Sequence, residues 1–215
     1  MNTQSHYVFF IRWCIYGLAG GFCIYEIFLG SWNGFGGPFR YLTIWALFLS
    51  FYSSNRMLAL SRSRTIRSHQ ITAICASVLN VMVVYLYWKL YFTDPSLVNS
   101  DGPSVWYREY YLHGLGPALQ IIDAVFIGRI HRRVWRAILP VLMIITAYVI
   151  WVELFVQKFN MEPVGSVTSG LPYPFLNSME LDERILFYAA NAGMAIALIA
   201  VFGIVRIGFD RIFRS

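Results

Sequence analysis

Six long apolar stretches constrain this chain more than any other feature, because a soluble globule of its size has too little interior to hold them. Hydrophobic residues make up 58% of the 215 residues, and charged residues only 13%. A helix needs about 20 mainly apolar residues to cross the hydrocarbon core of a bilayer. We therefore expect an all-α fold, a multi-pass membrane bundle that forms a single domain over residues 1–215. The expected transmembrane helices cover residues 7–29, 41–60, 71–92, 110–127, 137–156 and 185–205.

The arginines predict how this bundle is oriented. Those on one side of the six expected helices are Arg56, Arg62, Arg64, Arg67, Arg129, Arg132, Arg133, Arg136, Arg206, Arg211 and Arg214. The opposite loops hold Arg40, Arg108, Lys158 and Arg184. Short basic loops usually face the cytoplasm, so both termini are predicted to be cytoplasmic. The basic side would meet anionic lipid headgroups, so membrane lipids, and not nucleic acid, are the expected partners of a chain with net charge +6. Which membrane and which oligomeric state stay open.

Polar side chains within the spans are expected to meet near the outer surface. In this orientation Glu26, Thr43, Lys89, His113 and Glu153, from five different helices, all fall in the outer third of the membrane. Ionisable residues inside spans usually face the bundle interior. We interpret the two glutamates and the lysine first as structural ion pairs, which would border a hydrated polar pocket.

His113 and Thr43 are the strongest candidates for chemistry in this pocket. His113 begins the segment HGLGP, where Pro117 removes the helical hydrogen bond to the His113 carbonyl. A histidine that serves helix packing fits the pattern equally well. A threonine hydroxyl is a poor nucleophile without a base, but both residues lie about one turn into the same leaflet and can touch.

Asp123 lies deeper in the membrane than His113. It follows His113 by ten residues, which places it about 15 Å further along the helix and about 80° around it. We therefore exclude Asp123 as the partner that orients His113, and expect a structural hydrogen bond to another helix or a role in a proton path. Arg12, near the cytoplasmic end, is expected to extend to the headgroups.

The last outer loop, residues 158–184, is long and rich in residues that favour turns, among them Pro163, Gly170, Pro172 and Pro174. We expect it to fold back over the bundle as a cap.

Four short motifs link the chain to a known family. FRYLT (39–43), VMVVYLYWKLYFTD (81–94), HGLGPALQIID (113–123) and PYPFLN (172–177) stand in the order and spacing of that family. The chain resembles the six-span family of androgen-induced gene one and the androgen-dependent TFPI-regulating protein. Members are membrane hydrolases of fatty acid esters of hydroxy fatty acids, which use a threonine nucleophile and a histidine. The resemblance implies that Thr43 is the nucleophile and His113 the base.

The histidine motif departs from the family pattern. Animal members carry Asn-His-Gly-x-His, whereas LHGLG in this chain has one histidine. Neighbouring residues pair His113 with the first family histidine, but the ten-residue step to Asp123 pairs it with the second, catalytic one. We prefer the second register, which keeps the carboxylate and a base. In the first register Gly116 would occupy the catalytic position.

The chemistry that follows is acyl transfer without a cofactor or metal. Lys89, Tyr188 and Asn191 are candidates to stabilise the oxyanion, with Glu26 and Glu153 beside them. Transport of a small solute is a rival function, because the polar groups near the outer surface could bind such a solute. Against it, Asp123 is the one polar residue expected to continue a polar route further into the membrane. A haem or quinone electron carrier is another rival, but a bis-histidine haem would require paired membrane histidines, and His113 is alone in the expected spans. A noncatalytic lipid-binding or regulatory protein is the third alternative.

Overall fold

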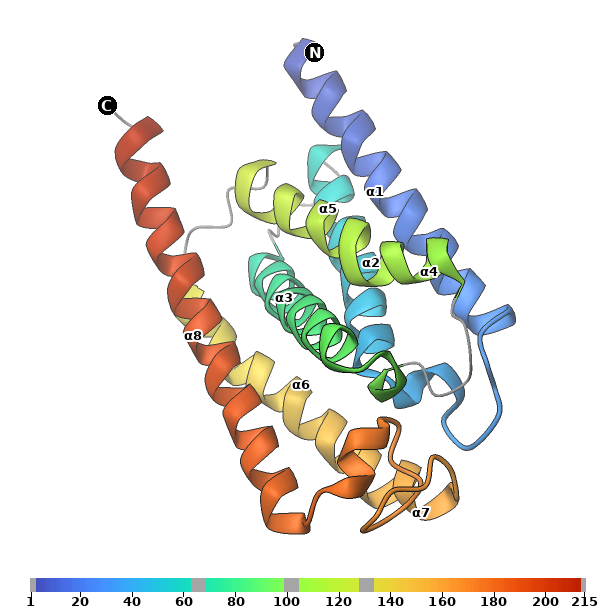
Figure 1. The fold of residues 1–215 in the computed structure, drawn as a ribbon. Coiled ribbons are helices and arrows are strands. Elements are labelled where there is room, and N and C mark those ends of the chain that lie inside the picture. The colour runs from blue at the N-terminus through green and yellow to red at the C-terminus, as the bar shows by residue number, and fades with distance from the viewer. Residues whose placement is uncertain (1–2, 63–68, 99–104, 128–133, 214–215) are drawn as a thin grey trace.

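The computed structural model describes residues 3–62, 69–98, 105–127 and 134–213, and within these ranges the chain is helical without a β-strand (Figure 1). The α-helices are α1 (Thr3–Phe28), α2 (Leu42–Ser61), α3 (Gln70–Thr93), α4 (Trp106–Tyr110), α5 (Gly116–Ile122), α6 (Ile138–Trp151), α7 (Gln157–Phe159) and α8 (Leu181–Phe213). The 3-10 turns are Gly37–Arg40, Pro95–Leu97, Val134–Ala137 and Pro174–Ser178. The π-helical turns are Tyr111–Leu115, Asp123–Ile127 and Val152–Val156.

Four helices of the described chain are long and apolar enough to cross a membrane. They are His6–Phe28, Gln70–Thr93, Val134–Phe159 and Leu181–Val205. These helices agree with four of the expected spans and are those of an integral membrane protein. The six-span count and the cytoplasmic termini stay predictions.

The two other expected spans are helical, but they differ from the four in composition and regularity. α2 carries Ser50 and Ser53, which are buried inside the protein. Residues 106–127 are divided by two π-helical turns and bury Gln120 and Asp123. Polar side chains lower the hydropathy of both segments because these helices present them to protein rather than to lipid.

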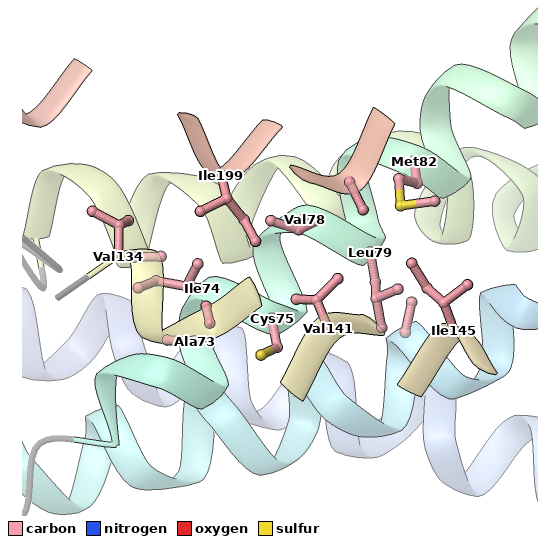
Figure 2. Packing of buried hydrophobic residues seen from close by; sticks show 14 of the residues in the cluster. Ala73, Ile74, Cys75, Val78, Leu79, Met82, Val134, Val141, Ile145 and Ile199 are labelled. Atoms are coloured by element: carbon pink, nitrogen blue, oxygen red, sulfur yellow. The ribbon is translucent and has the colours of Figure 1, made fainter. Parts of the chain in front are cut away.

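α3 lies at the centre of the bundle, between α2 and α5 on one side and α6 and α8 on the other (Figure 1). In the most apolar stretch of α3, 61% is buried inside the protein, whereas in the corresponding stretch of α8 only 11% is buried. Val78 and Leu79 of α3 are fully buried and pack in one cluster with Val141 of α6 and Ile199 of α8 (Figure 2). α3 is therefore enclosed, whereas α8 leaves an apolar face for lipid.

The two termini lie at the same end of the bundle, and the loop before α8 lies at the other (Figure 1). This arrangement agrees with chain ends on one side of a membrane. Six of the arginines on which the predicted charge asymmetry rests lie outside the described residues: Arg64, Arg67, Arg129, Arg132, Arg133 and Arg214.

Two asparagines organise the outer loop. Asn177 is fully buried; its amide exchanges two hydrogen bonds with the backbone of Leu171, at 3.1 and 2.9 Å. Asn160 does the same with the backbone of Phe35, at 2.8 and 3.1 Å, and so joins this loop to the one before α2. Gly170 has a φ of +88°, and a Cβ there would collide with the Asn160 carbonyl. The loop folds back tightly, as its composition predicts.

Candidate functional site

The start of α2, which carries Thr43, is held by Trp45 of the same helix and by side chains from other parts of the fold. The Phe39 carbonyl accepts hydrogen bonds from the indole N–H groups of Trp45, at 2.9 Å, and Trp151, at 3.1 Å. Both indoles satisfy a carbonyl that precedes the helix and has no helical donor. Thr43, the second residue of α2, therefore lies at a helix start that two indole hydrogen bonds hold in place.

Two tyrosines complete this support. The Tyr148 hydroxyl donates to the Arg40 carbonyl at 2.9 Å, and the Leu42 N–H donates to the Tyr173 hydroxyl at 3.3 Å. The second bond satisfies one of the orphan N–H groups at the helix N-terminus. The loop that carries Tyr173 thus contacts the residue next to Thr43.

The helix that carries His113 is distorted at this residue. His113 lies in the π-helical turn Tyr111–Leu115 and has non-helical angles, φ −112° and ψ 15°. Pro117 has no N–H to offer the His113 carbonyl, and the Trp88 indole N–H donates to that oxygen instead, at 2.8 Å. The distortion expected from HGLGP is therefore present and is satisfied by α3.

The imidazole of His113 lies between Thr43 and a glutamate. Its Nε2 is 3.4 Å from Thr43 Oγ1, and its Nδ1 is 3.0 Å from Glu109 Oε2. The Tyr87 ring stacks on the imidazole, with centroids 3.6 Å apart and planes 5° apart. His113 is only 6% exposed. Hydroxyl, imidazole and carboxylate therefore stand in the order of a nucleophile, a base and an orienting acid.

Glu109 was not predicted to be a functional residue. Asp123 was the acidic partner considered for His113. The signal was present, because residues four apart lie on the same face of a helix. Glu109 precedes His113 by that spacing.

Glu26 has a different partner from the one expected. The Arg108 guanidinium contacts both oxygens of Glu26, at 2.7 and 3.0 Å, and one oxygen of Glu109, at 3.1 Å. The lysine expected to pair with it, Lys89, is exposed, and its ammonium lies 5.8 Å from the centre of the Tyr85 ring. Arginine, with its planar fork, is suited to this bidentate contact.

Glu153, Tyr188 and Asn191 lie together on α8 and the end of α6. The Tyr188 hydroxyl donates to Glu153 Oε1 at 2.7 Å, and Arg184 Nε is 3.3 Å from the same oxygen. Asn191 donates to the carbonyl of Phe187 at 2.8 Å. The structural ion pair expected of Glu153 is thus made with an arginine of α8.

A cavity of about 360 Å³ opens beside these groups. Its wall includes Thr43, His113 and Glu109, together with Tyr188 and Asn191. Much of the remaining lining is apolar and comes from α2, α3, α6, α8 and the outer loop, for example Ile44, Met82, Ile145, Phe175 and Phe187. Among the described residues, neither Lys89, Glu26 nor Glu153 reaches this wall. A largely apolar cavity of this volume suits an apolar ligand, and the Thr43 hydroxyl is part of its wall.

Polar groups continue inward from Thr43, contrary to our expectation. A second cavity of about 20 Å³ touches Thr43, Ser50, Asn80 and Gln120. The Asn80 amide donates to Ser50 Oγ at 2.7 Å, and the Gln120 amide donates to Ser53 Oγ at 2.9 Å. These residues were not singled out in the sequence because they are scattered over three helices. A cavity of this size has room for one water molecule.

The inner end of this polar series is an ion pair. Arg12 Nε lies 2.7 Å from Asp123 Oδ1, and Arg12 also donates to the Met57 carbonyl at 3.2 Å. Arg12 is 5% exposed, so it does not extend to the headgroups as expected. The interior position is tolerated because the carboxylate compensates the buried charge. Asp123 thus bonds to another helix and lies away from His113.

The comparisons with known proteins agree with the motifs. The family model described as FAR-17a/AIG1-like protein matches residues 10–205. No curated protein and no solved structure matched the chain. The matched range includes Thr43, Glu109 and His113. Since the match covers most of the chain, this protein belongs to the FAR-17a/AIG1-like family.

Proposed function

We propose that the protein is an intramembrane hydrolase of lipid esters, with Thr43 as nucleophile and His113 as base. The observation that carries the proposal is the 3.4 Å separation between Thr43 Oγ1 and His113 Nε2 on the wall of a largely apolar cavity. Distances of this length are common in nucleophile and base pairs before substrate binds. The substrate class, fatty acid esters of hydroxy fatty acids, is taken over from the family resemblance.

Acylation proceeds by general base catalysis. Thr43 Oγ1 attacks the ester carbonyl carbon while its proton passes to His113 Nε2, and the carbonyl electron pair moves onto the oxygen. Glu109, beside Nδ1, favours the tautomer with hydrogen on Nδ1 and stabilises the imidazolium. The imidazolium then protonates the leaving alkoxide as its bond to carbon breaks, which releases the hydroxy acid.

Deacylation repeats these steps with water. Water attacks the acyl carbon and gives a proton to His113, and the bond from carbon to Thr43 Oγ1 breaks as the hydroxyl proton returns. The products are a free fatty acid and the original enzyme. No cofactor or metal takes part in this scheme.

The geometry around His113 favours the preferred register of the histidine motif. In the alternative register Gly116, which has no side chain, would occupy the catalytic position and no base would be present there. His113, whose ring already faces Thr43, is therefore the base in our proposal.

The proposal includes the membrane topology. In this topology α2 and residues 106–127 cross the membrane in addition to the four long apolar helices, which makes six spans. Both termini then lie on the cytoplasmic side, and the site lies near the outer leaflet. The lipid ester enters the site from the surrounding membrane. The apolar lining from five parts of the chain supports such an entry.

The experiment is hydrolysis by purified protein in lipid bilayers. Wild type is expected to cleave a fatty acid ester of hydroxystearic acid, and Thr43→Ala to reduce the rate by roughly 10³-fold or more. The control is Thr93→Ala, because Thr93 is exposed at the end of α3 and its hydroxyl donates to the Lys89 carbonyl of the same helix. Full activity in Thr43→Ala would contradict the proposal, and binding of the ester without cleavage by wild type would favour a noncatalytic lipid-binding protein.

Transport of a small polar solute is the second candidate. The inward series of Ser50, Asn80, Gln120 and Asp123 favours it, because a route across the membrane needs polar groups along its length. Flux into proteoliposomes that is the same in wild type and Thr43→Ala, without ester cleavage, would support transport over hydrolysis.

A further inference from the structure

Ester cleavage needs a donor for the oxyanion, and each candidate chosen from the sequence is partly or wholly engaged or lies outside the cavity wall. Tyr188 donates its single hydroxyl proton to Glu153 at 2.7 Å. Asn191 donates one of its two amide N–H groups to the Phe187 carbonyl at 2.8 Å and keeps the other. Lys89 is exposed and lies beside Tyr85 rather than in the cavity wall.

Two further donors of the cavity wall are also occupied. The Tyr148 hydroxyl donates to the Arg40 carbonyl at 2.9 Å. The Arg108 guanidinium binds Glu26 through two nitrogens and Glu109 through the third. To serve an oxyanion, the Tyr148 hydroxyl would first have to give up its bond to a buried carbonyl, which costs free energy. Arg108 keeps further N–H groups, but two carboxylates already balance its charge.

Tyr173 differs from these donors in the role of its oxygen. It lines the cavity, and its hydroxyl oxygen accepts the Leu42 N–H at 3.3 Å. The oxygens with which this hydroxyl interacts are those of Thr43 and Tyr148. Its O–H can therefore turn toward the cavity without abandoning a backbone carbonyl or a carboxylate.

The position of this hydroxyl suits a developing negative charge. It stands at the N-terminal end of α2, one residue before Thr43. The unpaired N–H groups of a helix N-terminus favour a nearby anion. The Tyr173 hydroxyl, which accepts the Leu42 N–H, lies at such a terminus.

The outer loop holds Tyr173 in place before substrate arrives. The buried Asn177 amide bonds to the carbonyl of Leu171 at 2.9 Å and to that of Tyr173 at 3.5 Å. Donors that need no reorganisation during the reaction contribute most to catalysis. Burial also raises the pKa of Tyr173 to about 12, so the phenol keeps its proton at neutral pH.

We propose that Tyr173 is a catalytic residue whose hydroxyl donates the hydrogen bond that stabilises the oxyanion. The inference rests on the proposed hydrolase function. The bond forms as the carbonyl electron pair moves onto oxygen during attack by Thr43, and no proton is transferred from the phenol. It weakens when the tetrahedral intermediate collapses, and it forms again when water attacks the acyl group.

The test compares Tyr173→Phe with Tyr188→Phe and Tyr85→Phe in the bilayer assay. Removal of one oxyanion donor typically lowers kcat by about 10²- to 10³-fold, so we expect such a fall for Tyr173→Phe with KM little changed. Tyr85 is exposed and outside the cavity wall, and its variant should match wild type. A larger fall in kcat for Tyr188→Phe than for Tyr173→Phe would overturn the assignment.

A second readout separates stabilisation of the oxyanion from a merely structural role, since Tyr173→Phe also removes the acceptor of Leu42. A long-chain alkyl boronic acid can form a tetrahedral adduct with the Thr43 hydroxyl and so mimics the transition state. The matching alkyl ether of a hydroxy acid cannot be cleaved and mimics only the ground state of the substrate. Tyr173→Phe should lower the affinity for the boronic acid by about the same factor as it lowers kcat, and it should leave the affinity for the ether unchanged. Equal loss for both ligands would overturn the proposal.

The two proposals fail in different ways. If hydrolysis requires Thr43 but Tyr173→Phe leaves its rate unchanged, the role of Tyr173 is refuted and the hydrolase function stands. A wild-type protein that cleaves no ester refutes the hydrolase function and this inference with it.

Discussion

At the scale of single residues, the site depends on a short series of contacts around one imidazole. Thr43 and Glu109 lie at its two nitrogens, and Tyr87 covers one ring face. The stacked ring and the flanking groups leave the imidazole little freedom to rotate. An imidazole held in this way keeps its Nε2 directed at Thr43 Oγ1, as the proposed mechanism requires.

Glu109→Gln tests the role of the carboxylate. The amide can no longer stabilise the imidazolium, and it can hold the ring in the wrong tautomer, so kcat should fall by roughly 10²- to 10⁴-fold. The rate of ester cleavage in bilayers measures this effect. Glu162→Gln, in the exposed outer loop, is the matched control. If Glu109→Gln retains the wild-type kcat, the carboxylate has no part in catalysis.

At the scale of elements, the π-helical turn around His113 and the helix α3 form one unit. Pro117 has no N–H to donate to the His113 carbonyl, and the Trp88 indole of α3 donates to that carbonyl instead, at 2.8 Å. The orientation of the histidine is thus tied to the packing of α3 against residues 106–127.

A double-mutant cycle of Trp88 and Pro117 tests this unit. Trp88→Phe leaves the His113 carbonyl unpaired and should lower the free energy of unfolding by about 1–3 kcal/mol. In a Pro117→Ala background the backbone N–H of residue 117 can reach that carbonyl, so the same change should cost less, with a coupling of about 0.5 kcal/mol or more. Unfolding by SDS in mixed micelles measures both costs. Additive effects would show that the indole bond and the proline act separately.

At the scale of the whole molecule, the arrangement of chain ends and loops bears on topology. Both termini lie at one end of the bundle, and the folded outer loop covers the other (Figure 1). The candidate site lies under this loop, because Tyr173 and Phe175 share the cavity wall with Thr43. Substrate access, catalysis and product release are therefore expected on the side away from the termini.

Cysteine labelling tests this topology. In a chain without Cys14, Cys23 and Cys75, we expect Ser166→Cys to react with a membrane-impermeant maleimide from the outer side of sealed vesicles. Cysteines at His6 and Arg211 should react only from the opposite side. Ser166, His6 and Arg211 are exposed in the structure. Labelling of the two chain ends from different sides would contradict an even number of spans.

The helical fold, the family and four of the six predicted spans followed from the sequence alone, because length, hydropathy and short motifs act locally along the chain. Thr43 and His113 were also singled out, since polar residues in apolar helices are rare and stand out. Their meeting at 3.4 Å depends on how the helices that carry them pack together.

Only the tertiary structure decided which charges pair and which groups line the cavity. Glu26 could have paired with Lys89, but Arg108 reaches it from the start of α4, and Lys89 faces outward. Arg12 is held inside by Asp123 instead of reaching the headgroups. The physical reason is that a partner in a low-dielectric interior is chosen by the rotation and packing of whole helices. Those rotations are set by contacts between residues far apart in the chain, which spacing along one helix does not encode.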